Sequence, residues 1–246
     1  MSSESMIVFT KENLDTYLKE LAKEFRKLNG KTTPAEIILI GGAAILANYG
    51  FREMTTDIDA LINAASSMDD AIVRVGDKFG LPYGWLNADF KQTTSYTPKL
   101  SQYSEYYRKY SNVLTIRTVS AEYLIAMKLC SGRKYKNDLS DVIGVLAAHE
   151  ERGESISLER IIKAATDLYG DWQKIPQESR DFIENAIAHG DYANVYASVS
   201  AQEKLSKELL IDFEENYPGV TTESNVNDVL AGLKARRQRM RQDEER

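Results

Sequence analysis

The triplet Asp57-Ile58-Asp59 carries the most chemical information in the sequence. In a strand, alternate side chains project from opposite faces, so both carboxylates would share one face and Ile58 would point to the other. Two carboxylates this close repel each other unless a cation neutralises them, and an all-oxygen ligand set suits Mg²⁺ or Mn²⁺. The triplet therefore predicts a divalent metal site at Asp57 and Asp59. The alternative is that both are turn residues after Thr55-Thr56.

The pair Gly41-Gly42 precedes this triplet. It follows the short apolar run Ile37–Ile40, which predicts a buried strand, and it precedes a predicted short helix over 43–49. Glycines at such a junction let backbone N–H groups approach a phosphate, with the positive end of the helix behind them. Alone, the pair could be a tight turn. Combined with the acidic strand, it joins a phosphate cradle to a metal site, and nucleoside triphosphate chemistry requires both.

Lys128 lies in the apolar run Tyr123–Cys130. A partly buried ammonium there needs an anionic partner, which a triphosphate, Asp138 or Asp141 could supply. The alternative is a lysine whose stem packs on a core helix while its ammonium reaches water.

A basic turn and an acidic pair follow Lys128. Opposite the glycine pair, Arg133, Lys134 and Lys136 would neutralise phosphate charge. Asp138 and Asp141, three residues apart, share one helix face. Either Asn137 or Asp138 could cap that helix. We expect Asp138 to be the cap and Asp141 to point inward in a functional role.

Hydrophobic periodicity predicts the elements that position these residues. Strands are predicted at 37–40, 57–62 and 113–118, and a tyrosine-rich irregular stretch at 83–110. Helices are predicted at 11–28, 43–49, 68–79, 121–131, 139–150, 158–168 and 178–189, with further helix to about residue 216. Thr10 is a predicted cap and Gly30 a predicted stop. Because strand signals end at Ser120, an α/β half of residues 1–118 precedes a helical domain of residues 119–216 and a weakly helical tail of residues 217–246.

Composition narrows the class of protein. The chain has 246 residues, 43% hydrophobic and 28% charged, which is typical of a globular protein with one large or two modest domains. Its single cysteine and two distant histidines cannot build a typical zinc site. No apolar run approaches the roughly 20 residues of a membrane helix, and no secretory pattern is present, so we expect a cytoplasmic protein without a membrane partner. The net charge of −6 argues against a protein that binds nucleic acid over its whole surface, but it allows a local basic cleft.

Two other regions could contact nucleic acid. Between Lys91 and Arg117, five tyrosines alternate with cations, a pattern that could stack RNA bases or form an ordinary surface loop. The tail carries Arg236, Arg237, Arg239 and Arg241, typical of a solvated helix face.

The motifs Ile40-Gly41-Gly42-Ala43 and Thr56-Asp57-Ile58-Asp59 resemble the active site of the DNA-polymerase-β-type nucleotidyltransferase superfamily. The later residues are similar to the lysine motif and the basic-acidic motif of the AbiEii-like toxin branch and related uncharacterised bacterial proteins. These are Ala126-Met127-Lys128-Leu129, Arg133, Lys136, Asp138 and Asp141. The resemblance covers roughly residues 35 to 145.

The resemblance implies an α/β (α+β) fold, with a nucleotidyltransferase-type mixed sheet, flanking helices and an all-helical C-terminal domain. It implies Mg²⁺- or Mn²⁺-dependent transfer of a nucleoside monophosphate from a nucleoside triphosphate to an RNA, such as a transfer RNA, or to a protein hydroxyl. Asp57 and Asp59 would hold the metal, with Lys128 and Asp141 also catalytic. Gly41, Gly42, Arg133 and Lys136 would bind the nucleotide. The protein would be the toxin of a bacterial toxin–antitoxin or phage-defence system, with a cognate antitoxin as partner.

The sequence departs from the superfamily at two points. Active polymerases place a third metal carboxylate on a later strand, but the run Val113–Arg117 has none, and Asp89 and Glu105 are the nearest substitutes. The usual Gly-Ser is Gly-Gly here. Both departures favour the alternative function, a non-catalytic nucleotidyltransferase-like module that acts as an antitoxin, adaptor or nucleotide sensor.

Overall fold

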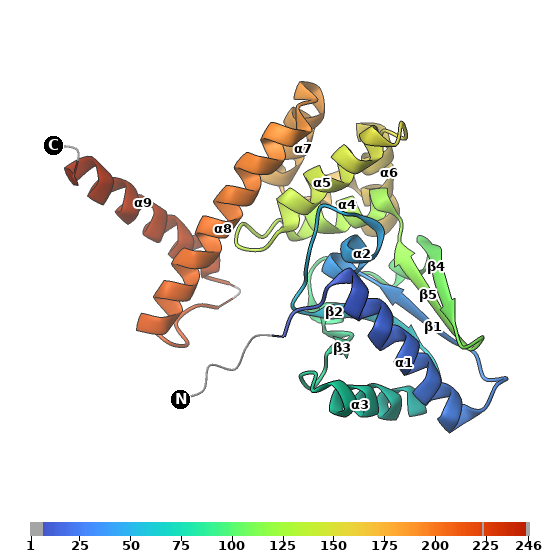
Figure 1. Ribbon diagram of the computed structural model, residues 1–246. Coiled ribbons are helices and arrows are strands. Elements are labelled where there is room, and N and C mark those ends of the chain that lie inside the picture. The colour runs from blue at the N-terminus through green and yellow to red at the C-terminus, as the bar shows by residue number, and fades with distance from the viewer. Residues whose placement is uncertain (1–6, 223, 245–246) are drawn as a thin grey trace.

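The computed structural model describes residues 7–222 and 224–244, and its centre is a five-stranded sheet in the order β3-β2-β1-β5-β4 (Figure 1). The strands are β1 (Ala35–Leu39), β2 (Ile58–Asn63), β3 (Leu86–Asn87), β4 (Ser104–Tyr110) and β5 (Leu114–Val119). The central strand β1 is antiparallel to β2 and parallel to β5. The outer pairs are parallel for β2 with β3 and antiparallel for β4 with β5. The expected mixed sheet and α/β class are confirmed.

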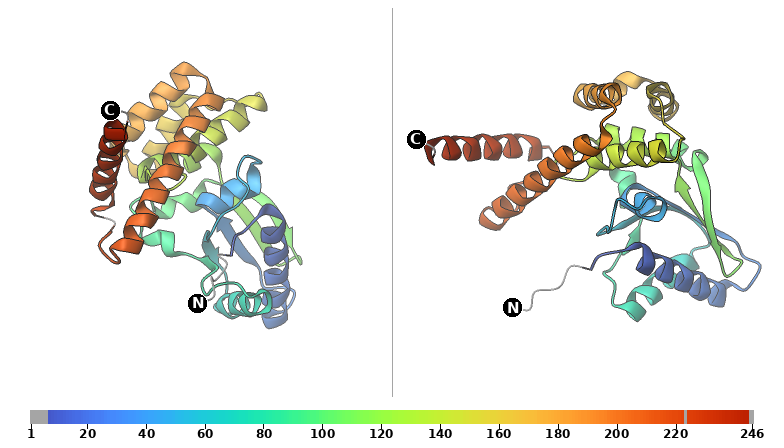
Figure 2. Two further views of the ribbon diagram at one scale, coloured as in Figure 1. Left: turned by 60° about the vertical axis from the view of Figure 1, so that its left-hand side comes forward. Right: turned by 45° about the horizontal axis from the view of Figure 1, so that its top comes forward.

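Helices lie on both sides of this sheet. The first three are α1 (Lys11–Asn29), α2 (Gly41–Asn48) and α3 (Ser67–Phe79). The later ones are α4 (Ala121–Ser131), α5 (Asp138–Glu151), α6 (Leu158–Tyr169), α7 (Gln177–His189), α8 (Tyr192–Asn216) and α9 (Val226–Glu244). Short 3₁₀ turns cover Asp89–Gln92 (η1), Pro98–Gln102 (η2) and Trp172–Lys174 (η3). In Figures 1 and 2, α1 and α3 lie together on one side of the sheet, whereas α2 faces the bundle that begins with α4.

Helix α1 illustrates how the sequence determines these elements. Its apolar stripe, which includes Leu14, Leu18 and Phe25, is fully buried. Thr10 and Asn13 form a reciprocal capping box, and Gly30 ends the helix with a φ of +81°. Both predicted boundaries are confirmed, because a side-chain oxygen at the start and a residue without Cβ at the end satisfy the free backbone groups.

Two local features differ from the predictions. Helix α2 begins at Gly41, so the glycine pair forms its first turn instead of preceding it. The stretch predicted as irregular contains β3, two 3₁₀ turns and β4, which forms a hairpin with β5. Ser111 and Asn112 both have positive φ, and the Val113 N–H donates to the Tyr110 carbonyl at 3.1 Å across the turn. Positive φ at both central residues matches the right-handed twist of a hairpin.

One apolar core links the sheet to the helices that follow it. Its buried residues extend from Phe9 to Ala186 without a break at the expected boundary after residue 118. Beyond this core, the first part of α8 packs against α5, whereas its later part and α9 extend away from the bundle (Figure 2). The buried side chains of α8 are Glu203 and Ser206. In the described ranges, no helix is long and apolar enough to cross a membrane.

Candidate nucleotide site

A cleft with a cavity of about 470 Å³ lies where the sheet meets α4. Four residues predicted from the sequence line it: Gly41, Asp59, Lys128 and Arg133. The remaining lining residues are Ile40 before α2, together with residues of the segment after β3 and of the end of α4, which are Asp89, Phe90, Gln92, Thr93, Ser95, Met127 and Ser131. A hollow of this size suits a small-molecule ligand.

The predicted strand begins one residue later than expected, so Asp59 lies in β2 and Asp57 directly precedes it. Ile58 and Ala60 are fully buried, whereas Asp57 is exposed and Asp59 is partly exposed. The Thr55 hydroxyl donates to Asp57 Oδ1 at 3.2 Å. Burial, and then the like charge of Asp57, raise the pKa of Asp59 to about 6, although Arg133 and Lys128 act in the opposite direction. A cation near both carboxylates would remove this repulsion.

Asp89 is the nearest further carboxylate. It begins η1, two residues after Asn87, which pairs with Asp59 in the β2–β3 register. Asp89 lines the cleft, and its charge also contributes to the raised pKa of Asp59. Glu105, the other substitute, lies on the edge strand β4 opposite Thr118 and does not line the cleft.

These donors fit a hard divalent ion. Aspartate oxygens are the ligands that Mg²⁺ prefers, and Mg²⁺ commonly takes one or two protein carboxylates together with substrate phosphates and water. Within residues 7–222 and 224–244, no three acidic, histidine or cysteine side chains converge as a ready-made metal cluster. Asp57 and Asp59 could therefore hold Mg²⁺ together with a phosphate ligand.

The glycine pair places a helix N-terminus at the cleft. Gly41 has a φ of +54°, and a Cβ on it would lie 3.9 Å from Asp59 Oδ2. The N-cap residue, Ile40, has no side-chain oxygen to occupy the first-turn N–H groups of α2. Such N–H groups favour an anion.

Gly42 leaves space for two neighbouring side chains. A Cβ at this position would lie 2.6 Å from the Thr55 hydroxyl oxygen and 2.9 Å from Arg52 Nη2. The region that a serine side chain would occupy is thus already filled by a hydroxyl and a guanidinium. Sequence reasoning missed Arg52, since its acidic partner Asp141 is 89 positions away and no local pattern links them.

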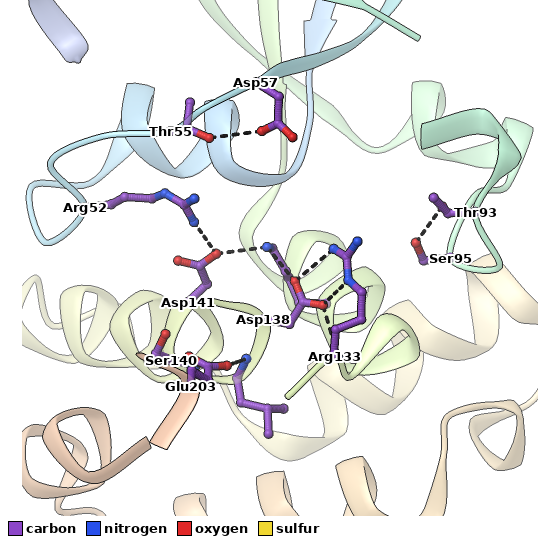
Figure 3. A network of polar contacts seen from close by, with 12 residues as sticks. Arg52, Thr55, Asp57, Thr93, Ser95, Arg133, Asp138, Ser140, Asp141 and Glu203 are labelled. Atoms are coloured by element: carbon purple, nitrogen blue, oxygen red, sulfur yellow. Dashed lines mark hydrogen bonds and ion pairs between the residues drawn. The ribbon is translucent and has the colours of Figure 1, made fainter. Parts of the chain in front are cut away.

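The opposite wall is a network of buried ion pairs (Figure 3). Lys128 Nζ lies 2.8 Å from Asp138 Oδ1 and 2.9 Å from Asp141 Oδ2. Arg133 Nε lies 2.8 Å from Asp138 Oδ2, and Arg52 Nη1 lies 2.5 Å from Asp141 Oδ2. Burial opposes the charge on Lys128, but the two carboxylates outweigh it and raise its pKa. Burial likewise opposes the charge on Asp138, yet Lys128 and Arg133 lower its pKa well below the usual range.

This network decides three sequence-based alternatives. Lys128 is only 7% exposed, so the solvent-reaching interpretation is wrong, and its partners are the two aspartates. The expectation that Asp138 caps α5 is also wrong. Asn137 occupies the cap position, and the Asp138 carboxylate points to Lys128 and Arg133 instead. Asp141 points inward, as expected.

A glutamate from α8 occupies the start of α5 in place of the predicted cap. Glu203 Oε1 accepts the Leu139 N–H at 2.9 Å and the Ser140 N–H at 3.4 Å. The side chain is buried, which raises its pKa to about 7. The distance in sequence, 64 residues to Leu139, explains why no local pattern revealed it.

Several predicted binding residues lie elsewhere. Lys136 does not line the cleft and shares a separate hollow with Lys207 and Ile211. Lys134 pairs with Glu178 at 2.5 Å.

Most of the tyrosine-rich segment is engaged within the fold. Tyr103 stacks on Tyr123 with ring centroids 3.9 Å apart, and Tyr110 and Arg108 both bond to Asp15. Tyr106 remains 64% exposed. The segment is therefore mainly structural.

The fold and the cleft define a nucleotidyltransferase-like protein, and a comparison with protein families agrees. Residues 16–182 match the family described as nucleotidyltransferase of unknown function (DUF6036). The match includes the glycine pair, the acidic triplet and the α4–α5 network, and the chain belongs to this family. No curated protein and no solved structure gives a match.

Proposed function

We propose that this chain is a metal-dependent nucleotidyltransferase that transfers a nucleoside monophosphate from a nucleoside triphosphate to a hydroxyl group of an RNA or protein. The acceptor oxygen would attack the α-phosphorus, the bond from that phosphorus to the β-phosphate oxygen would break, and pyrophosphate would leave with that electron pair. The acceptor proton would pass to solvent or to a carboxylate of the cleft. The observation that carries the proposal is that Asp59, Asp89 and the Gly41 helix N-terminus line one cleft. Asp57 does not line the cleft itself but lies close enough to Asp59 to raise the pKa of that carboxyl.

Each wall has a role in this reaction. Asp57 and Asp59 would hold Mg²⁺ or Mn²⁺, which when bound neutralises charge on the phosphates. The N–H groups of Gly41 and Gly42 would bind phosphate oxygens, and Arg52 and Thr55 would supply the polar contact that the family serine makes elsewhere. Arg133 lines the cleft and would neutralise phosphate charge. Lys128 and Asp141 would position Arg52 and Arg133 through the ion-pair network.

The resemblance to AbiEii-like toxins supports a finer form of this proposal. The protein would act in the bacterial cytoplasm, inhibit growth by modifying an RNA such as a transfer RNA, and be restrained by a cognate antitoxin.

A second candidate function is a binding module that holds a nucleotide without turnover. The observation that favours it is the absence, in the described residues, of a three-carboxylate cluster. Asp89 can distinguish the transferase from the binding module. If it completes the metal site in the presence of a nucleotide, Asp89→Asn lowers turnover while nucleotide binding persists.

The decisive experiment incubates the purified protein with each labelled nucleoside triphosphate, Mg²⁺ and bulk cellular RNA and protein. We expect covalent labelling of one acceptor class by the wild type and none by Asp59→Asn. Asp77→Asn, an exposed carboxylate on α3, is the matched control and should label normally. Metal-dependent nucleotide binding without labelling would establish the binding module, and absence of nucleotide binding would exclude both functions.

A further inference from the structure

The loop between α4 and α5 separates the cleft from a second hollow. Ser131 lines both, so the two spaces adjoin. The second hollow has a volume of about 540 Å³, and Lys134 and Lys234 line it. These two lysines are close enough that Lys134 lowers the pKa of Lys234, after the larger effect of burial. The second hollow, which shares Ser131 with the cleft, thus reaches α9 through Asn227 and Lys234.

Helix α9 carries charge of one sign over most of its length. Between Asp228 and Asp243, every charged residue is a cation. No ion pair involves these cations in the part of the chain that the structure describes, and the side chain of Arg241 lies outside it. Arg236 and Arg239 are exposed. We use the term basic track for a set of exposed and half-buried cations, which are Lys136, Lys207, Lys234, Arg236, Arg237 and Arg239.

Three of the acids near the basic track are already engaged. Glu178 pairs with Lys134 at 2.5 Å. Glu214 accepts the Gly219 N–H at 2.6 Å in the turn after α8, and Glu203 is buried at the start of α5. The basic track therefore keeps its positive charge in a chain whose net charge is −6. A helix face that is only solvated usually mixes signs, as α8 does with Lys204, Glu208 and Asp212.

We propose that the basic track binds single-stranded RNA and leads its 3′ end past Ser131 into the cleft. The inference rests on the proposed function, because it names RNA as the acceptor class, and it gives α9 a role outside the family match of residues 16–182. Cations grouped along one helix can contact consecutive phosphates of a single strand. Helix α9 diverges from the bundle (Figure 2), so a strand can lie along it.

The test is the binding of a fluorescein-labelled, unstructured RNA of about 15 nucleotides, a length that one such surface can cover. Anisotropy is measured in EDTA, so that neither metal nor nucleotide transfer contributes. The triple variant Arg236→Gln, Arg237→Gln, Arg239→Gln should bind at least about tenfold more weakly at low salt. Its slope of log affinity against log salt should fall by about 2, since each lost phosphate contact removes about 0.7.

A control variant removes the same charge elsewhere. Lys11, Lys19 and Lys31 are exposed in or beside α1, across the sheet from the bundle. Their joint replacement by Gln should leave RNA binding within about twofold of the wild type, a margin well below one lost phosphate contact. A charge-preserving variant with Lys at 236, 237 and 239 should bind nearly as the wild type, which separates charge loss from any damage to the helix.

Three outcomes would overturn the inference: wild-type affinity in the Gln variant, an equal loss in the α1 control, or equal α9-dependent binding of a DNA strand of the same sequence. Nucleotide binding by calorimetry is measured on the same proteins. Failure there with RNA binding intact would count against the proposed function alone.

Discussion

On the sheet side of the cleft, Asp57, Asp59 and Asp89 carry like charge, and no ion pair neutralises them among the described residues. On the helical side, Arg52, Lys128 and Arg133 enclose Asp138 and Asp141 in close ion pairs. The first wall has three carboxylates without a cation, and the second has three cations for two carboxylates. Both carboxylates of the helical wall are paired with cations of the same wall, so this wall stabilises the fold without a ligand. The sheet wall has no such internal partner among the described residues, which is why we propose a cation there.

The largest expected effect comes from breaking the helical wall. Lys128→Met removes the ammonium between Asp138 and Asp141 and leaves two buried carboxylates with one partner each. We expect the free energy of unfolding to fall by about 3–5 kcal/mol. Urea unfolding measures it, with Lys19→Met, at an exposed position of α1, as the control. An unchanged midpoint would mean that Lys128 is not buried in solution.

A smaller effect is expected at the junction of the two walls. Gly42→Ser restores the serine usual in the superfamily but forces its Cβ against Thr55 and Arg52. We expect a loss of about 1–3 kcal/mol in stability, together with weaker nucleotide binding. Adding Thr55→Ala should recover part of the stability. Gly50→Ser meets no neighbouring atom and should be neutral. Tighter nucleotide binding by Gly42→Ser would show that Arg52 and Thr55 do not replace the serine.

The pH dependence of the free energy of unfolding tests Glu203, which is buried at the start of α5 behind the helical wall. Burial raises the pKa of Glu203 from 4.5 to about 7. The folded state therefore binds more protons than the unfolded state between these values, and stability falls as pH rises through this window. Glu203→Gln keeps an acceptor for the Leu139 N–H and removes this loss. Relative to wild type, the variant should gain up to about 2 kcal/mol between pH 4.5 and 8. A stability difference that is the same at both pH values would contradict the raised pKa.

The smallest effect is expected on the sheet wall without metal. Because the pKa of Asp59 is raised from 3.8 to about 6, its ionised form costs stability above pH 6 and costs little below pH 4. In EDTA at pH 8, Asp59→Asn should raise the free energy of unfolding by about 1 kcal/mol. Asp77→Asn provides the baseline in the same thermal scans. Destabilisation by Asp59→Asn would show that this wall neutralises its own charge.

Local sequence patterns predicted most elements and the acidic and glycine motifs. Interactions within a few residues determine the apolar stripe and the N-cap of α1. They also determine the alternation of buried and exposed side chains around Ile58. Strand β4 was missed because it is an edge strand with mostly exposed side chains, so neither a buried run nor a clean alternation marks it. Its tyrosines are positioned by partners from other elements, such as Tyr123 and Asp15.

The part of the site that could not be predicted depends on contacts distant in sequence. Arg52 meets Asp141, and Glu203 reaches Leu139, across 89 and 64 positions. No periodicity encodes such pairs. The wrong expectation for Asp138 has the same cause. A carboxylate at a helix start is a good N-cap by local pattern, but here the cations Lys128 and Arg133 bind it instead.

The core that continues from Phe9 to Ala186 joins the two walls of the candidate site into one unit. A chain shortened after Thr118 would keep Asp57, Asp59 and the glycine pair. It would, however, leave Phe51 without Gly144 and the Asn48 carbonyl without Arg152, and it would remove every member of the ion-pair network except Arg52. The sheet alone is therefore half of the candidate site. A fragment that keeps both walls would need the residues from the sheet through α7 as one piece.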